Sequence, residues 1–424
     1  MLRLYPSKIM HLKNHSIQIN LRFHKWYNLS ILNLCAIALL GMVLRSKMVF
    51  ALPFINYNHL LEAHSHFSLG GWATLAIMTL SVSELLPESF NSKPIYQWLL
   101  GSIFVCAWCM LITFLLWGYS AISTASSVFF IVLNYFWGGI FLKDFLKTKT
   151  ESSVRLLALS SVLCLILSTF GLLIVSYIYF SKSFDAILYR NALFTYLHFL
   201  YNGFFTLAIF ALLFNHISQK ITEKARKNIR RFSMAVSVSV IPSLFITYLW
   251  QDPNMWIRLI AIIGCLLLLL CFYLFLITSI SLKPNYRNER LVMRFLILIS
   301  MVSFMLKIFL QSFTVFPEIG NAIFGNRPVI MGFLHMVFLG FVTLFILAYF
   351  IKQGILNSTM KWVNVAIYLF AVAVVINEVV LLTQGLTTML MAGSMVFPCL
   401  LWMTGILLFS GSVFIALGRI QSRE

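Results

Sequence analysis

The sequence predicts an all-α polytopic membrane protein, a single bundle of twelve transmembrane helices with both termini in the cytoplasm. Hydrophobic residues make up 61% of its 424 residues and charged residues only 10%, and the mean hydropathy is strongly positive. Apolar runs of about 20 residues, enough to cross roughly 30 Å of hydrocarbon, recur along almost the whole chain. No room remains for a sizeable soluble domain.

The apolar runs and the loops between them define the predicted elements. Twelve spans are expected near 28–50, 59–86, 95–117, 120–142, 154–180, 191–215, 232–250, 255–282, 291–315, 328–351, 361–383 and 391–417. The membrane domain is therefore 28–417, between a cytoplasmic N-terminal tail, 1–27, and a cytoplasmic tail, 418–424. No strong internal repeat is apparent, so one membrane domain is the economical interpretation.

The basic residues test this topology, because cytoplasmic loops collect Lys and Arg. With both termini inside, 24 of the 31 basic residues fall in inner segments, six fall in outer loops, and one, Lys307, lies within a span. Their spread over short loops argues against a nucleic-acid partner, in spite of the formal charge of +19. The sequence therefore predicts a multi-pass membrane protein with the lipid bilayer as its partner.

Five of the nine histidines, His59, His64, His66, His198 and His335, lie in the predicted spans 2, 6 and 10. His64, His198 and His335 each follow the polar start of an inward-running span by about seven residues, or roughly 10 Å of helix. Polar side chains inside a membrane usually face the bundle interior, so a shared level predicts a shared site.

Other polar residues of the spans reach about the same level: Glu62, Lys307, Gln311, Asn377 and Glu378. An alternative interpretation is an interhelical hydrogen-bond network in which Lys307 extends toward the interface.

His64 and His66 must have different roles, because positions i and i+2 of a helix point about 160° apart. Glu62 stands one turn before His66 and could orient its ring by a hydrogen bond. His64 shares its face with Ser68 and Gly71, which leaves room for a planar macrocycle. Zinc is the next candidate, but no cluster with tetrahedral spacing supports it.

These residues resemble those of the haem-copper oxidase subunit I superfamily, whose core has twelve transmembrane helices and cytoplasmic termini. The stretch "YNHLLEAH", residues 57–64, is similar to the helix II pattern of that family, and "GFLHMVFLG", residues 332–340, is similar to its helix X pattern. The resemblance implies that His64 and His335 are the two axial ligands of a low-spin haem.

The chain also departs from that family. Its seventh span has no histidine where the family has a copper-binding pair, and Phe333 stands in the place of the first helix X histidine. His198 corresponds to the helix VI copper ligand only by span and depth, so it is a candidate metal ligand or a support for a propionate, water or small ligand. A complete oxygen-reducing centre and bound copper are not expected. NnrS-type haem membrane proteins are a second family of similar appearance.

The preferred interpretation is a haem-binding protein that holds one low-spin haem between His64 and His335, for electron transfer or for response to a diatomic gas. It would be an oxidoreductase component of a respiratory or nitric-oxide-related system, with other membrane subunits as candidate partners. Lys307 could pair with Glu62, Glu378 or a haem propionate. Two alternatives stay open: a proton-coupled transporter that uses these histidines and carboxylates, and a non-catalytic assembly subunit.

Overall fold

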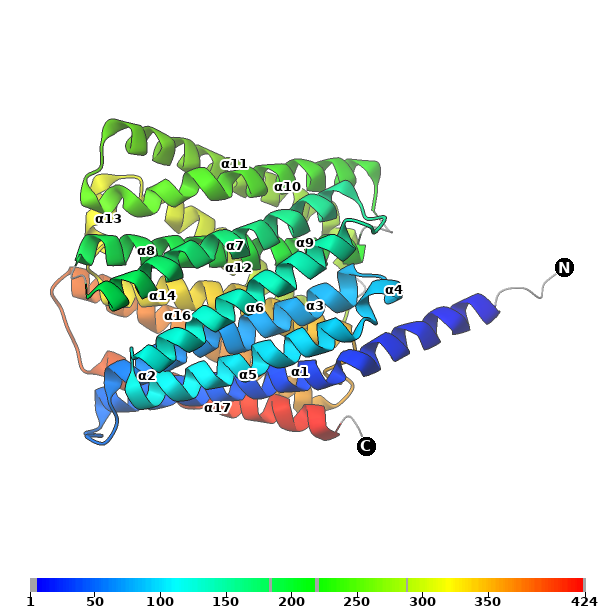
Figure 1. The fold of residues 1–424 in the computed structure, drawn as a ribbon, viewed down its shortest axis with the longest axis horizontal. Helices are drawn as coiled ribbons and strands as arrows, with labels where there is room; N and C mark the ends of the chain where they lie inside the picture. The colour runs from blue at the N-terminus through cyan, green and yellow to red at the C-terminus, as the bar shows by residue number, and fades with distance from the viewer. Residues whose placement is uncertain (1–5, 183–184, 218–220, 287–288, 422–424) are drawn as a thin grey trace.

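The computed structural model describes residues 6–182, 185–217, 221–286 and 289–421. Long helices run roughly along one direction, and the described part of the chain contains no strand (Figure 1). Eleven helices are long and apolar enough to cross a membrane. The predicted class, an all-α polytopic membrane protein, agrees with this architecture.

The helices follow the predicted spans to within a few residues at most ends. Their bounds are α1 Pro6–Val49, α2 Tyr57–Phe67, η1 Ser68–Thr74, α3 Leu75–Leu85, α4 Glu88–Asn91, α5 Pro94–Trp117, α6 Ala121–Phe145, α7 Ser152–Ser181, α8 Ala186–His198, η2 Phe199–Phe205, α9 Thr206–Ile217, α10 Glu223–Leu244, η4 Phe245–Gln251, α11 Met255–Tyr286, α12 Leu291–Phe313, α13 Pro317–Ile323, α14 Arg327–His335, η5 Met336–Thr343, α15 Leu344–Lys352, α16 Lys361–Met389 and α17 Val396–Gln421.

The prediction and the structure differ in three places. Helix α10 begins at Glu223, nine residues before the predicted start of the seventh span. Residues 6–27, expected as a tail, continue α1 as helix. The predicted span near 59–86 is helical from Tyr57 to Leu85 but is not among the eleven apolar helices. Its outer part carries Glu62, His64 and His66, which lower its mean hydropathy.

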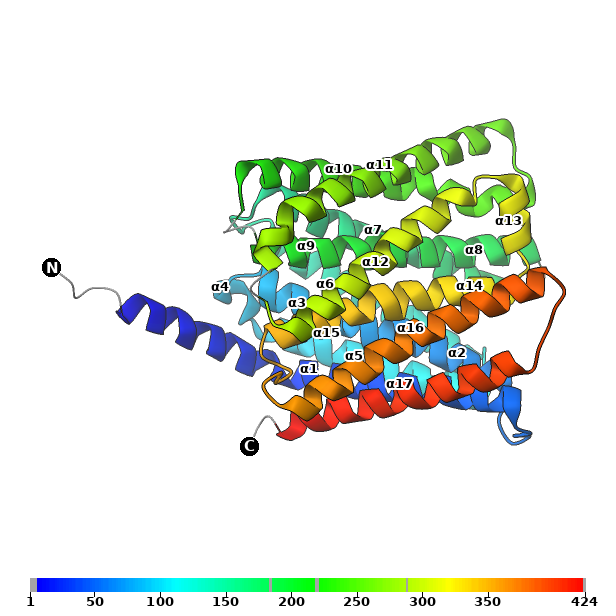
Figure 2. The same cartoon turned by 180° about the vertical axis from the view of Figure 1, so that it is seen from behind.

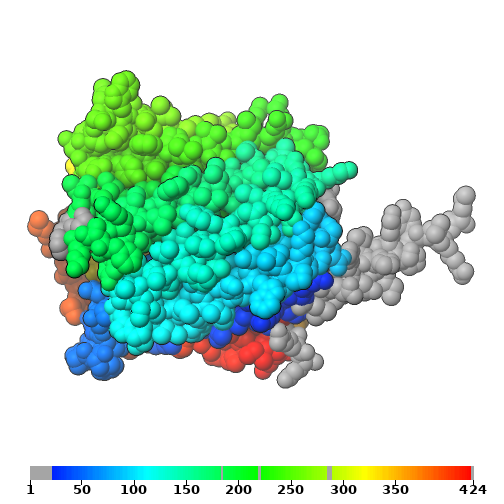
Figure 3. All heavy atoms as spheres, viewed as in Figure 1, coloured from blue at the N-terminus to red at the C-terminus, as the bar shows by residue number. Residues whose placement is uncertain are grey.

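Helix α1 begins and helix α17 ends at the same end of the bundle (Figures 1 and 2). We call this the inner end, in accord with the predicted topology, and the opposite one the outer end. Helix α17 packs along α1. On the face shown in Figure 3, the colour passes from blue in the lower part through cyan to green in the upper part, so segments of the first half of the chain cover this face.

Three long rods lie in the interior: α2–η1–α3, α8–η2–α9 and α14–η5–α15, which we call the central rods. Each has a π-helical segment in its middle, and η5 contacts both η1 and η2. Each rod also starts at a side-chain cap: Asn56, Asp185 and Asn326 accept hydrogen bonds from backbone N–H groups of the first turn. Such caps fix where a helix begins, and therefore the depth of the residues that follow.

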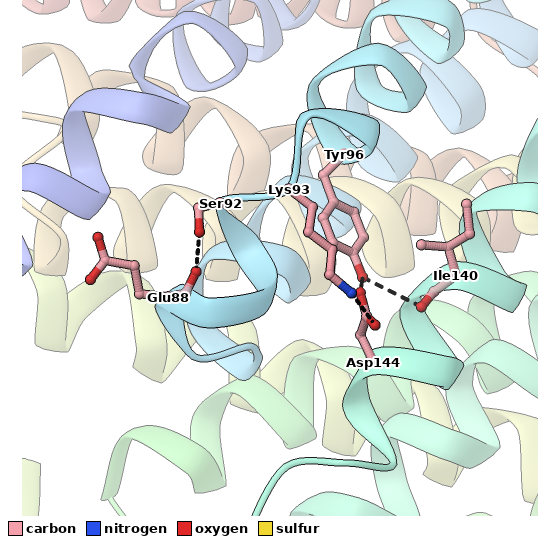
Figure 4. A network of polar contacts seen from close by, with 6 residues as sticks. All are labelled: Glu88, Ser92, Lys93, Tyr96, Ile140 and Asp144. Carbon is pink, nitrogen blue, oxygen red and sulfur yellow. Dashed lines mark hydrogen bonds and ion pairs between the residues drawn. The ribbon is translucent and has the colours of Figure 1, made fainter.

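At the inner end, Asp144 ties α6 to α5 (Figure 4). Its carboxylate accepts a hydrogen bond from Lys93 Nζ at 2.5 Å and another from the Tyr96 hydroxyl at 2.9 Å. The Asp144 side chain is 1% exposed, whereas Lys93 is 41% exposed. The buried carboxylate is therefore satisfied by one neutral donor and by one cation that reaches solvent.

We expect Asp144→Ala to lower the free energy of unfolding by about 2–3 kcal/mol, because it leaves the buried Tyr96 hydroxyl with only the Ile140 carbonyl, at 3.4 Å, as an acceptor. Thermal unfolding of the detergent-purified protein measures the change. Lys147→Gln, at an exposed position just after α6, is the matched control and should change the free energy of unfolding by less than about 0.5 kcal/mol. Equal effects of the two variants would contradict the prediction.

Candidate functional site

The three central rods share a sequence pattern that coincides with their π-helical segments. A histidine is followed at the fifth position by a glycine, then by an aromatic residue and, two positions later, by a threonine. The copies are His66-Gly71-Trp72-Thr74, His198-Gly203-Phe204-Thr206 and His335-Gly340-Phe341-Thr343. The chain thus contains an internal repeat, contrary to the expectation from sequence. Rare π-helical turns are frequent at functional sites, so this level of the bundle is the first place to look for one.

A π-helix opens the regular backbone ladder, and here a neighbouring helix supplies a donor to each π segment. The bonds run from Asn33 Nδ2 to the Gly71 carbonyl at 2.6 Å, from Ser161 Oγ to the Phe204 carbonyl at 2.9 Å, and from Ser300 Oγ to the Phe341 carbonyl at 2.8 Å. The donors lie on α1, α7 and α12. Each of these helices precedes, in the chain, the central rod to which it donates. The irregular backbone is therefore satisfied within the protein, as membrane depth requires.

The outer halves of the central rods are packed less tightly than the inner halves. In the inner halves, ten of the eleven residues of α3 and eight of the nine of α15 are buried. In the outer half, none of the nine residues of α14, all of them described, is fully buried. His64 and His335 keep accessible surface although they lie inside the bundle. The interior therefore has space around these two imidazoles.

His335 presents one free ring nitrogen. Its Nδ1 lies 2.7 Å from the Met331 carbonyl, which can only accept, so Nδ1 carries the proton. In the neutral ring, Nε2 then keeps its lone pair. Metal-binding histidines typically donate the other N–H to a backbone carbonyl in this way.

His64 contributes an unpartnered nitrogen from α2. Its Nδ1 is buried and forms no hydrogen bond with any residue that the structure describes. The ring lies against α1, where a Cβ at Gly41 would be 3.3 Å from Cε1, and the Ile37 carbonyl lies within hydrogen-bonding reach of the ring. His64 and His335 are close enough for their charges to interact. Two imidazoles from separate rods thus lie near each other, and one of them has a buried nitrogen that lacks a partner.

Arg45, on α1, adds a cation to this pair. Its guanidinium donates to Asn377 Oδ1, to the Leu401 carbonyl at 3.0 Å and to Thr404 Oγ1 at 3.4 Å. Asn377 donates in turn to Glu378 Oε1 at 2.9 Å, and the Glu378 carboxyl interacts with the charge of Arg45. Arg45 also interacts electrostatically with both imidazoles. A carboxylate-bearing ligand would find a positive group here.

His198 has both ring nitrogens in hydrogen bonds to protein. Nε2 donates to the Val240 carbonyl at 2.8 Å, and Nδ1 accepts from Asn202 Nδ2 at 3.0 Å. The residue is fully buried. Metal binding at His198 would require one of these bonds to break, so its present geometry fits a structural link between the second central rod and α10.

His66 faces the loop between α5 and α6 instead of Glu62. Its ring stacks on Phe114 with 4.2 Å between centroids, and Nε2 lies 3.4 Å from the Tyr119 hydroxyl. Burial raises the pKa of the Tyr119 phenol, which therefore stays protonated. Glu62 interacts with His59 and with the Tyr119 main-chain N–H. Glu62 and His66 therefore do not contact each other as predicted. Instead, each of them contacts Tyr119, in the loop between α5 and α6.

Lys307 lies near the middle of the bundle, and no carboxylate is within ion-pair distance of it in the described part of the chain. It is 2% exposed, its Nζ donates to Thr206 Oγ1 at 3.1 Å, and the Tyr201 ring centroid is 5.7 Å away. Neither Glu62 nor Glu378, its predicted partners, is among these contacts. The cation is held by a hydroxyl and by aromatic faces.

We expect Lys307→Met to raise the free energy of unfolding by about 1–2 kcal/mol, because it removes a buried charge and keeps the side-chain volume. Thermal unfolding in detergent measures this change. Lys361→Met, at an exposed position at the start of α16, should change it by less than about 0.5 kcal/mol. A clear loss of stability in Lys307→Met alone would show that its hydroxyl and aromatic contacts outweigh the cost of burial.

Comparison with known proteins adds no family assignment: no protein-family model and no curated protein matches the chain. Among the described residues, no three or more His, Cys, Asp or Glu side chains gather as a metal-ion site. Two imidazoles suffice as protein ligands for a haem iron, because the macrocycle supplies the other four nitrogens. The donor set formed by His64 and His335 therefore fits a haem better than it fits a bare metal ion.

Proposed function

We propose that this chain is a bacterial inner-membrane haem-binding protein that holds one low-spin haem between His64 and His335. The observation that carries the proposal is the pairing of the unpartnered His64 Nδ1 with a His335 ring whose Nδ1 is anchored and whose Nε2 is free. Accessible space around both rings supports it. Its function would be electron transfer or response to a diatomic gas.

The roles of the surrounding residues follow from their contacts. The Met331 carbonyl fixes the tautomer and the orientation of His335. Arg45, itself held by Asn377, would meet a propionate of the bound group. A haem with two imidazole ligands supplies a one-electron couple, while the protein determines its burial and access. His66 and Glu62 support the wall of the site through their contacts to Tyr119.

The topology belongs to the same proposal. Counting Tyr57–Leu85 as a span gives twelve crossings with both termini in the cytoplasm, in accord with the ends of α1 and α17 (Figure 1). The His64–His335 pair then lies in the outer half of the bilayer. The resemblance to oxidase subunit I supports this placement, whereas Phe333 and the hydrogen bonds of His198 argue against a second, copper-containing centre.

A visible spectrum of the purified protein, oxidised and then reduced with dithionite, tests the proposal. Sharp α and β bands on reduction, with a stoichiometry of one haem per chain, are expected. Protein that is purified without iron or a Soret band, from cells competent in haem synthesis, would contradict it. In that case, the transporter and the assembly subunit become the leading interpretations.

A further inference from the structure

We propose that Tyr57 and Arg327 form a gate over the His64–His335 site, through which a small uncharged molecule enters from the outer aqueous phase. Tyr57 is the first residue of α2, and Arg327 is the first residue of α14. The Arg327 guanidinium donates to the Tyr57 hydroxyl at 2.7 Å and lies 5.4 Å from the centroid of its ring. This pair joins the outer ends of the two rods that carry the imidazoles.

The gate lies directly above the site because of helical periodicity. Tyr57 and His64 are seven residues apart on α2, and Arg327 and Leu334 are seven apart on α14. Residues seven apart share a helix face, with the second about 10 Å further along the axis. His64 therefore lies beneath Tyr57, and Leu334, next to His335, lies beneath Arg327.

The Arg327 face of α14 turns away from α16. A Cβ at Gly332 would contact Leu381 of α16, and Val329 contacts Gly385 of the same helix. Leu334 follows Gly332 by two residues, about 200° around the helix, so it points away from α16. Leu334 nevertheless keeps accessible surface at this depth. Space therefore exists beneath the Tyr57–Arg327 gate, on the side of α14 that faces His64 of α2.

The contact between Arg327 and Tyr57 can hold the gate closed, and it can also break without a large cost in free energy. It consists of one hydrogen bond and one cation–π contact at an exposed arginine, both of which compete with water. No covalent or main-chain bond has to break when it opens. The inference rests on the proposed function for its meaning, because the site below is the one assigned to haem.

The experiment measures the rate at which a small neutral maleimide labels Leu334→Cys in the detergent-purified full chain. The parent carries Cys109→Ser and Cys399→Ser, which remove the two exposed native thiols. Arg327→Gln and Tyr57→Phe are compared in this background. Arg190→Gln is the matched control, because Arg190 is an outer-end arginine that stacks on Trp250, 4.5 Å from the ring centroid.

We expect Arg327→Gln to raise the labelling rate about tenfold, and Tyr57→Phe to raise it less because the ring remains for the cation–π contact. Arg190→Gln should leave the rate unchanged. Equal rates in parent and gate variants, an equal rise in the control, or an introduced thiol that reacts in no variant would each overturn the gate. The absorption spectrum is measured separately. If the Soret band is missing but labelling still depends on the gate residues, the haem proposal is contradicted and the gate proposal stands.

Discussion

His64→Ala and His335→Ala are each expected to abolish the sharp α and β bands of the reduced protein. A low-spin haem needs two strong axial ligands, and alanine supplies none. His335→Ala also removes the side-chain donor to the Met331 carbonyl, but that carbonyl keeps the main-chain N–H of residue 335 as its helical partner. The measurement is the dithionite-reduced spectrum, together with the haem content per chain.

Two other histidine variants serve as controls for this prediction. His59→Ala changes a half-exposed residue at the outer end of α2, and His198→Asn changes a ring whose nitrogens both bond to protein. Both should keep the bands. Retention of the bands in either His64→Ala or His335→Ala would mean that another residue ligates the iron.

Gly203→Ala is expected to destabilise the fold by about 3 kcal/mol or more, through overpacking where η2 meets α7. A Cβ at position 203 would lie 2.3 Å from the Cβ of Cys164, an atom that no side-chain rotation can move. Gly340→Ala should cost less, because the close atom there is Ser303 Oγ at 2.6 Å, which can rotate away. Thermal unfolding and the yield of folded protein measure both effects.

The matched control for Gly203→Ala is Gly139→Ala. Gly139 lies within α6, and a Cβ there would meet no atom within 4 Å. That variant should gain up to about 1 kcal/mol from better helix propensity. Cys164→Gly combined with Gly203→Ala should recover much of the lost stability. If the double variant unfolds as readily as Gly203→Ala, the close contact is not the cause.

The spans could be predicted because a membrane imposes a simple rule on the sequence. Each crossing needs about 20 apolar residues, and the charged loops between them are easy to recognise. The predicted span that is not among the eleven apolar helices is Tyr57–Leu85, whose outer part carries the site residues. The polar character that lowers its hydropathy is the same feature that drew attention to His64.

The internal repeat could not be found as easily. Its copies share a histidine, a glycine, an aromatic residue and a threonine, and most other positions differ. Apolar residues are interchangeable in most of these spans, so long stretches keep no detectable identity. The π segments reveal the repeat because the same backbone irregularity recurs three times at one level.

Arg45 is the residue of the candidate site that the sequence analysis missed. The predicted topology counts it among the outer charges, yet it lies inside the predicted span 28–50, which marks it as an intramembrane cation. Its contacts to Asn377, Leu401 and Thr404 come from helices far away in the chain. No local pattern could indicate which of the intramembrane charges meets the histidines.

The sequence by itself determined the class of the protein and the approximate ends of its helices, because these depend on hydropathy and on rise per residue. Only the tertiary structure decided which nitrogen of which imidazole is free. That choice depends on neighbouring residues. Both ring nitrogens of His198 form hydrogen bonds, one with a carbonyl and one with an amide, and the Tyr119 hydroxyl lies beside His66. Arg45 interacts electrostatically with His64 and His335. Hydrogen-bond partners are a property of packing, and packing joins residues that the sequence keeps apart.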